Sequence, residues 1–491
     1  MLNPVSLSLR GRPESMFSPP YANSFQNFIC PSFTRCHELH PVATMTQSKK
    51  NTIEPSVSGS RRNFIKDSGL LIAGGAIVGG GLSVAQAAHA YGSDLIKVGL
   101  IGCGGRGTGA AVQALNTSGG DVRITAMGDI FANNVQTAYR SIKSEHGDKI
   151  DDNKFVGLDA YKDVLASDVD VVILATPPGF RPLHFEKAVE AGKHVFMEKP
   201  VAVDAPGVRR VLAAGKLAEK RGLAVQVGLQ RHHEFRYKEC VAKLHEGAIG
   251  DPIFARAYWN AAGVWNRPRR DDQTELEYQL SNWYYFNWLC GDHINEQHIH
   301  NIDVINWVMK DHPVEAQGQG GREVRKGSNA GQIFDHHMIE FTYDNGTKML
   351  SQCRHIPGCW SEVTEHVHGT NGYCDVSAAK IFDTKNKLVW ESDAKEVSGK
   401  GWQQEHHDLF AALRNGQIPN ETEYAAISTM TAIFGRMASY SGKVVKWDEA
   451  FNSNLSLANV DSLHSFNDIP PLMPNDQGEY EVAVPGRSKV I

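Results

Sequence analysis

The stretch that most constrains the fold is "LIKVGLIGCGGRG", residues 95–107. Its first seven residues form the apolar run of a buried parallel strand, and Gly102, Gly104 and Gly107 make a G-x-G-x-x-G turn that opens a helix. In such a turn the first glycine permits a tight bend, the second lets the backbone approach a pyrophosphate, and the third allows the helix to pack closely on the strand. The stretch predicts a dinucleotide-binding unit, with Gly105 and Arg106 of the same turn as further cofactor contacts.

A second strand is predicted within residues 121–130, and Asp129 stands at its carboxyl end. This is about the distance from the glycine turn at which a carboxylate binds the adenosine ribose hydroxyls. No arginine or lysine follows immediately, so the sequence favours NAD over NADP as the cofactor. A helix-capping or turn aspartate is the competing interpretation.

The alternation of strands and helices continues to about residue 230, which predicts a doubly wound parallel sheet, and hence an α/β domain, over residues 91–230. Ligands of such sheets bind at the carboxyl ends of the strands. Two strand ends there carry residues that we expect to contact the cofactor: Thr176, Pro177, Glu198 and Lys199.

After residue 231 the pattern changes to strands that alternate polar and apolar residues and are separated by turns. This alternation predicts an α+β domain with an open, largely antiparallel sheet over residues 231–450. Residues 451–491 are expected to form a covering tail.

The segment "GDHINEQHIHNID", residues 291–303, is unusually dense in histidines and acids. Spacings of four, four and three predict that Asp292, Glu296, His300 and Asp303 share one helix face. A histidine there titrates in the range needed to remove a hydroxyl proton, and neighbouring carboxylates would orient it. A metal site competes with this interpretation, but His298 and His300 would point in different directions, so we predict no metal ligand set.

Together, the glycine turn, the "EKP" strand end at 198–200, the mixed sheet and the E-x-x-x-H-x-x-D pattern resemble the Gfo/Idh/MocA family, from about Ile96 to Lys446. The resemblance implies a nicotinamide held in the first domain and hydride transfer to or from a carbinol carbon of a sugar or polyol. It implies that Lys199 is the catalytic lysine and that Glu296 and His300 form the acid–histidine pair. The family has aspartate where this chain has Glu296, which puts the reach of that carboxylate in doubt.

Polar and aromatic residues of the second domain are expected to line the substrate cleft, where flat rings stack on sugars. These are Arg231, His232, Tyr237, Trp283 and Asp303. For each ring, packing in the core is the competing interpretation.

We therefore expect a NAD-dependent oxidoreductase that acts on a sugar, polyol or glycoside. Two alternatives remain: a NAD-using glycoside hydrolase that works by transient oxidation and elimination, and a non-catalytic sugar-binding protein on the same fold. A net charge of -5 gives no reason to expect a nucleic-acid partner. The exposed face of an open sheet leads us to expect a homo-oligomer.

The first 90 residues read as a leader with a twin-arginine signal. Arg61 and Arg62 precede a glycine-rich apolar stretch that ends in the cleavage-site pattern Ala88-His89-Ala90. A single membrane anchor is the alternative, and Met45 stands where a signal of ordinary length would begin. The pattern predicts export to the periplasm with the twin-arginine translocase as a partner, and hence a cofactor that stays bound.

Overall fold

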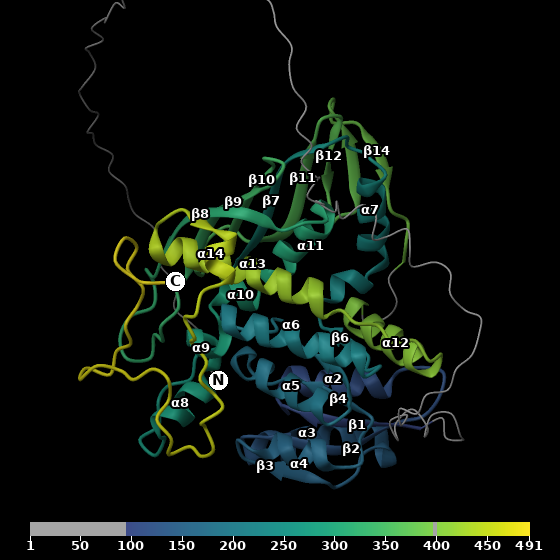
Figure 1. The fold of residues 1–491 in the computed structure, drawn as a ribbon, viewed down its shortest axis with the longest axis vertical. Coiled ribbons are helices and arrows are strands. Elements are labelled where there is room, and N and C mark those ends of the chain that lie inside the picture. The colour runs from purple at the N-terminus through teal and green to yellow at the C-terminus, as the bar shows by residue number, and fades with distance from the viewer. Residues whose placement is uncertain (1–94, 396–399) are drawn as a thin grey trace, which may run out of the picture. The chain divides into compact units, whose positions relative to one another are not determined.

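Two β-sheets organise the part of the chain that the computed structural model describes, residues 95–395 and 400–491. The predicted leader, with its arginine pair and cleavage site, lies outside these residues. Helices α13 and α6 lie between the two sheets (Figure 1). No helix among the described residues is long and apolar enough to cross a membrane.

The first sheet has six parallel strands in the order β3-β2-β1-β4-β5-β6. Its strands are β1 (Ile96–Ile101), β2 (Val122–Asp129), β3 (Lys154–Val156), β4 (Val171–Leu174), β5 (His194–Met197) and β6 (Val225–Val227). Its helices are α2 (Gly105–Leu115), α3 (Ala132–His146), α4 (Ala160–Ala166), α5 (Arg181–Glu190) and α6 (Ala205–Lys220). The strand order reverses between β1 and β4, where a doubly wound sheet binds its ligand.

The first sheet is covered on both faces because its central strands are apolar on both sides. All four residues of β4 are buried, as are five of the six in β1. The glycine turn follows β1, and Gly102 adopts a positive φ of 98°. A Cβ atom at Gly107 would lie 1.8 Å from the carbonyl oxygen of Gly102, so only glycine fits there.

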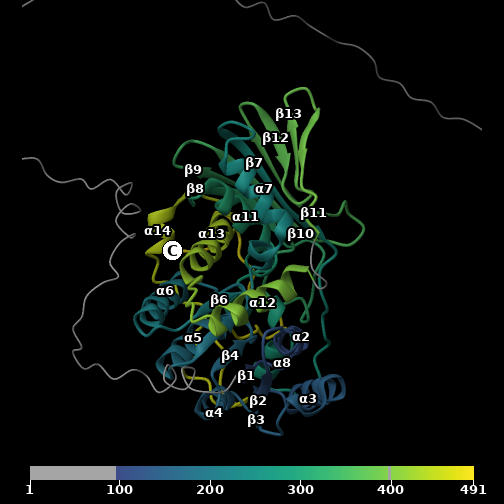
Figure 2. The same cartoon turned by 90° about the vertical axis from the view of Figure 1, so that its right-hand side faces the viewer.

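Among the described residues the second sheet has nine strands in the order β14-β13-β12-β11-β7-β10-β9-β8-β15, and only β7 and β10 pair in parallel. Figure 2 shows strands of this sheet in the upper part of the view. The strands are β7 (Pro252–Ala261), β8 (Pro313–Gly321), β9 (His336–Tyr343), β10 (Lys348–His355), β11 (Glu362–Gly369), β12 (Gly372–Asp375), β13 (Lys380–Asp383), β14 (Leu388–Glu391) and β15 (Val445–Lys446). Burial alternates along β10, as expected for a sheet with one covered face. The predicted fold class is confirmed.

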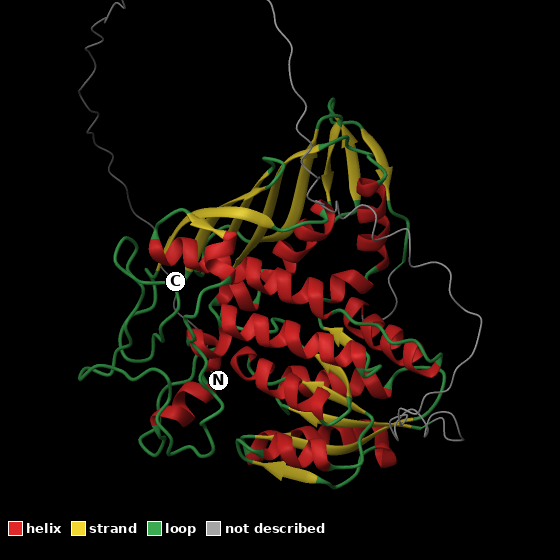
Figure 3. Ribbon diagram, viewed as in Figure 1, coloured by secondary structure: helices red, strands yellow, loops and turns green. Residues whose placement is uncertain are grey.

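Helices cover one face of the second sheet (Figure 3). The helices after the first domain are α7 (Phe235–His245), α8 (Glu275–Ser281), α9 (Asn287–Cys290), α10 (His293–Glu296), α11 (Ile299–Met309), α12 (Lys400–Arg414), α13 (Thr422–Ser441) and α14 (Trp447–Phe451). Helix α11 contacts β7 and β11, and α13 contacts β8, β9 and α6. The second sheet therefore packs onto the first domain through α13.

Helix α12 comes late in the chain but packs on the first domain. Its Leu409 and Phe410 belong to the same buried cluster as Val98 and Ala110 of the dinucleotide-binding unit. The side chain of Gln403 donates to the backbone oxygen of Gln113 in α2, at 3.0 Å. An early and a late segment of the chain thus share one hydrophobic core.

A buried histidine joins the end of the first domain to α12 and α13. His233 lies in the short 3-10 helix Gln230–His233; its Nδ1 is 2.7 Å from Oδ2 of Asp408, and its Nε2 is 3.4 Å from Oε1 of Glu421. Burial opposes the charge, but the two carboxylates outweigh it and raise the pKa of His233 to about 9.

This pairing predicts that stability falls in mildly alkaline solution. A histidine whose pKa rises on folding stabilises the folded state fully below its unfolded pKa of about 6.5, and that contribution disappears as the pH passes the folded value. We expect the free energy of unfolding to fall by up to about 3 kcal/mol between pH 6.5 and pH 9.5 through this group. Urea unfolding at several pH values measures it. His233→Gln should remove this loss and the exposed control His245→Gln should keep it; an unchanged pH dependence in His233→Gln would contradict the assignment.

Candidate active site

Lys199 and Glu296 meet where the two domains face each other. Lys199 follows β5 and precedes a cis peptide bond to Pro200, so it stands at the carboxyl end of the parallel sheet. Its Nζ lies 2.9 Å from Oε1 of Glu296 and also donates to the backbone oxygen of Glu296. Each side chain is only 13% exposed, so the ammonium is held by its partner rather than by bulk water.

His300 is a buried histidine of this site, with 7% of its surface exposed. It lies in the first turn of α11, and its ring stacks on Trp259 of β7 with centroids 6.0 Å apart. Among the described residues its Nδ1 has no hydrogen-bond partner. Burial, with the positive charges of Lys199, Arg231 and Arg106, holds the pKa of His300 well below its ordinary value. The imidazole is therefore neutral, the form that can accept a proton.

The predicted single helix face is wrong. Helix α10 ends at Glu296 and α11 begins at Ile299, so Glu296 and His300 lie on two helices with a break between them. Asp292 is not part of either helix, because it adopts a positive φ of 71° at the start of α10. Its carboxylate is buried among residues from distant strands and helices, which the local spacing could not reveal.

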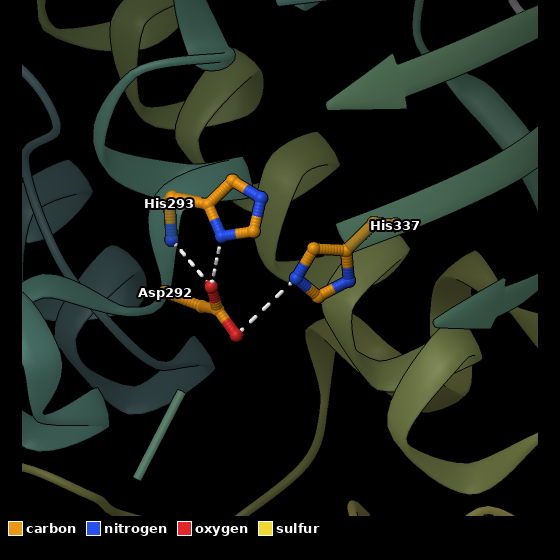
Figure 4. A group of neighbouring side chains, drawn as sticks. All are labelled: Asp292, His293 and His337. Carbon is orange, nitrogen blue, oxygen red and sulfur yellow. Dashed lines mark hydrogen bonds and ion pairs between the residues drawn. The ribbon is translucent and has the colours of Figure 1, made fainter. Parts of the chain in front are cut away.

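Figure 4 shows where Asp292 lies. One carboxylate oxygen is 2.7 Å from Nδ1 of His293 and also accepts from the backbone N–H of that residue. The other accepts from the hydroxyl of Tyr440 at 2.5 Å and from the backbone N–H of Phe334 at 3.0 Å, and lies 3.2 Å from Nε2 of His337. Burial opposes ionisation, but the two imidazoles hold the pKa of Asp292 well below its ordinary value.

Asp292, His293 and His337 could also be considered as metal ligands, because their ligand atoms lie within 4.8 Å of one another. However, the separations of 2.7 and 3.2 Å suit hydrogen bonds, and each carboxylate oxygen already accepts from at least two donors. We interpret the group as a hydrogen-bonded anchor for α10. His355 holds both ends of that helix: its ring stacks on His293 at the start, with centroids 4.3 Å apart, and its Nε2 lies 2.7 Å from the side chain of Gln297, which follows the last residue.

The cofactor side of the site fits a dinucleotide. The N-terminus of the eleven-residue helix α2 is not capped by any side chain of the described residues, so its N–H groups are free for phosphate oxygens. No atom lies within 4 Å of a Cβ built on Gly104 or Gly105, which leaves open space above the turn. Asp129 accepts from the backbone N–H groups of Cys103, at 2.7 Å, and Phe131, at 2.8 Å, so its carboxylate is fixed beside the glycine turn.

Arg106 does not extend freely toward this space. Its guanidinium pairs with Glu198 and with Glu405 of α12, the latter at 3.1 Å. The predicted cofactor residues Arg106 and Glu198 are therefore bound to each other, and they join the glycine turn to the strand end that carries Lys199. The hydroxyl of Thr176 lies 3.1 Å from Nδ1 of His184, and Pro177 precedes the short 3-10 helix Pro178–Phe180.

Three of the predicted substrate residues, Arg231, Tyr237 and Asp303, are buried and bind other side chains of the protein. Arg231 pairs with the buried Glu365, and the hydroxyl of Tyr237 donates to the same carboxylate at 3.1 Å. Asp303 is 2% exposed and is engaged by His232 at 2.8 Å and by the hydroxyl of Ser428 at 2.7 Å.

Trp283 and His232 keep partly exposed side chains. Trp259, Glu365 and Glu405 were not among the predicted site residues. The alternation of residues along β7 and β11 is a signal that could have placed the first two on the covered face, but no local pattern indicated Glu405.

Two family models match the chain. Residues 96–229 match the model described as "Oxidoreductase family, NAD-binding Rossmann fold", and residues 237–374 match the GFO/IDH/MocA C-terminal domain. An inositol 2-dehydrogenase of Azotobacter vinelandii is 29% identical over 37% of this chain and 48% of its own length. An inositol 2-dehydrogenase 3 of Saccharopolyspora erythraea is 24% identical over 65% of this chain and 82% of its own length. Several of the similar curated relatives are thus matched over only about half their length.

Solved structures share the fold. A levoglucosan dehydrogenase in complex with NADH and levoglucosan superposes with a TM-score of 0.58 at 16% identity, covering 72% of this chain and 99% of that one. A scyllo-inositol dehydrogenase of Lactobacillus casei with bound NAD(H) and scyllo-inositol gives a TM-score of 0.54 at 18% identity, with coverages of 72% and 99%. The expected NAD-binding domain and its companion domain are confirmed.

The Asp292 anchor predicts a large and specific loss of stability. Asp292→Asn replaces an acceptor oxygen by an amide that faces other donors, so we expect the free energy of unfolding to fall by about 2–4 kcal/mol. Chemical denaturation measures this, with the exposed Asp344→Asn as the matched control. A loss no larger than that of the control would contradict the anchor. If a chelator destabilised the wild type as much as the substitution does, the group would be a metal site instead.

Proposed function

Because the chain belongs to the Gfo/Idh/MocA family of oxidoreductases, we propose that it is a NAD-dependent dehydrogenase acting on a carbinol carbon of a sugar, polyol or glycoside. One observation carries the proposal: Lys199, paired with Glu296, stands at the carboxyl end of the dinucleotide-binding sheet. There its positive charge adds to the burial that keeps the imidazole of His300 neutral. Relatives named inositol 2-dehydrogenases and neighbours solved with levoglucosan or scyllo-inositol support a cyclic polyol or sugar as substrate.

The residues divide the chemistry of alcohol oxidation between them. A nicotinamide bound in the first domain would supply the acceptor for the hydride that leaves the carbinol carbon. His300 takes the hydroxyl proton, since its imidazole is neutral and its Nδ1 has no hydrogen-bond partner among the described residues. Lys199 donates a hydrogen bond to the substrate oxygen, and Glu296 fixes the ammonium in place. In the reverse direction the same groups return the proton to a carbonyl oxygen.

We expect His300→Ala and Lys199→Met each to lower turnover by about 10²-fold or more while leaving the dinucleotide bound, because the proton-transfer groups lie apart from the glycine turn. The double variant should lose less than the product of the two losses, since both groups act on one oxygen. Matched controls are His366→Ala on β11 and the more exposed Lys348→Met on β10. The measurement is reduction of bound NAD across a panel of sugars and polyols.

Three outcomes of this experiment are decisive. Wild-type rates in His300→Ala on a substrate that reduces the bound cofactor would contradict the proposed roles. Release of an aglycone without net NADH would indicate the redox-neutral glycoside hydrolase. Failure of the wild type to bind NAD(H) at all would leave a sugar-binding protein as the better interpretation.

We also propose that the protein is exported to the periplasm by the twin-arginine route. The support is the order of Arg61 and Arg62, an apolar stretch and an A-x-A site in the sequence. Replacing both arginines by lysine keeps the charge but should abolish export, because the pair is recognised by a receptor. Fractionation of cells that express each form measures this. Normal export of the double-lysine variant would show another route.

A further inference from the structure

The C-terminal tail runs along the carboxyl edge of the first sheet. Backbone N–H groups of Leu457 and Ala458 donate to Oδ2 of Asp204, which follows β5, at 2.6 and 3.2 Å. Farther along, the ring of Phe466 stacks on Phe131, which follows β2, with centroids 5.5 Å apart and planes at 19°. The segment 457–466 therefore reaches from the loop after β5 to the loop after β2.

An ion pair and a histidine–carboxylate contact hold the middle of this segment. Both carboxylate oxygens of Asp461 accept from the guanidinium of Arg210 in α6, at 2.9 and 3.0 Å. Nδ1 of His464 lies 3.4 Å from Oδ2 of Asp159, which precedes α4. The bidentate arginine pair is the stronger of the two, because both of its bonds are charge-assisted.

The Phe131–Phe466 stack stands at the adenosine end of the cofactor site. In a doubly wound sheet the adenosine half of a dinucleotide lies over the end of the second strand, where a carboxylate binds the ribose. That carboxylate is Asp129, which is two residues before Phe131 and accepts from its backbone N–H at 2.8 Å. A displaced Phe466 would therefore uncover the loop that fixes Asp129.

The tail also forms one side of a pocket. This pocket, of about 200 Å³, is partly open and lies between the tail and the first domain. Its walls include Leu158 and His184 of the first domain and Val460 and Leu463 of the tail. The ring of His184 contacts Thr176 through Nδ1, and its buried Nε2 has no partner among the described residues. The tail therefore covers the outer side of this pocket and is attached to the first domain through Asp204, Arg210 and Phe131.

We propose that residues 457–466 are a strap that closes the adenosine end of the cofactor site and makes the dinucleotide slow to leave. The inference rests on the cofactor binding of the proposed function and adds the residues that retain the cofactor. Release requires local opening of the strap, which breaks the Arg210–Asp461 pair and unstacks Phe466. Dissociation is then limited by that opening and not only by contacts to the nicotinamide and phosphates.

The test is the dissociation rate of NADH from the full chain. Protein loaded with NADH is mixed with excess NAD⁺, and the loss of bound-NADH fluorescence is followed. Phe466→Ala should release NADH at least about tenfold faster than the wild type, because affinity changes within one site appear mainly in the dissociation rate. The matched control is Ile469→Ala, three residues on in the tail and 77% exposed, which should dissociate at the wild-type rate.

A second variant keeps the test independent of any folding defect in Phe466→Ala. Asp461→Asn weakens the anchor on α6 without touching Phe131, and it should also release NADH several-fold faster. Wild-type dissociation rates in both variants would overturn the strap, as would equal acceleration in Ile469→Ala. A wild type that binds no NADH would instead overturn the proposed function, so the two failures are distinguishable.

Discussion

The contact between Lys199 and Glu296 is the interaction on which the site depends. An ammonium that is 13% exposed has lost most of its water, and without a partner it would be strongly destabilised. Glu296 supplies that partner from the other domain, so the two domains must pack in one relation for the charge to be satisfied. The pair therefore fixes the side chain of Lys199 and the domain arrangement together.

The position of Glu296 is in turn set by a buried carboxylate. Helix α10 has only four residues and cannot hold its own orientation. Asp292 anchors its start to β9 and α13 through His337 and Tyr440, and the ring of His293 packs on His355. The buried, hydrogen-bonded carboxylate of Asp292 thus determines where the carboxylate of Glu296 can reach.

Burial and the charges around the cleft together set the protonation state of His300. Lys199, Arg231 and Arg106 all disfavour its protonation, and each is itself paired with a carboxylate: Glu296, Glu365 or Glu198. These pairs come from strands and helices of both domains. The site therefore holds a neutral imidazole among paired charges, the state that the proposed removal of a hydroxyl proton requires.

The sequence by itself determined the first domain, the class of the second, and the place of Lys199 at a strand end. Those features are local, since an apolar run, a glycine turn such as Gly102–Gly107 and strict alternation each act within a few residues. Only the tertiary structure decided that Glu296 and His300 lie on separate helices, because the side chains at the break, Gln297 and His298, contact His355 and Ser351 of β10, far away in sequence. The same reason applies to Glu405 and to the tail at Phe466, whose partners Arg106 and Phe131 are more than 290 residues earlier in the chain.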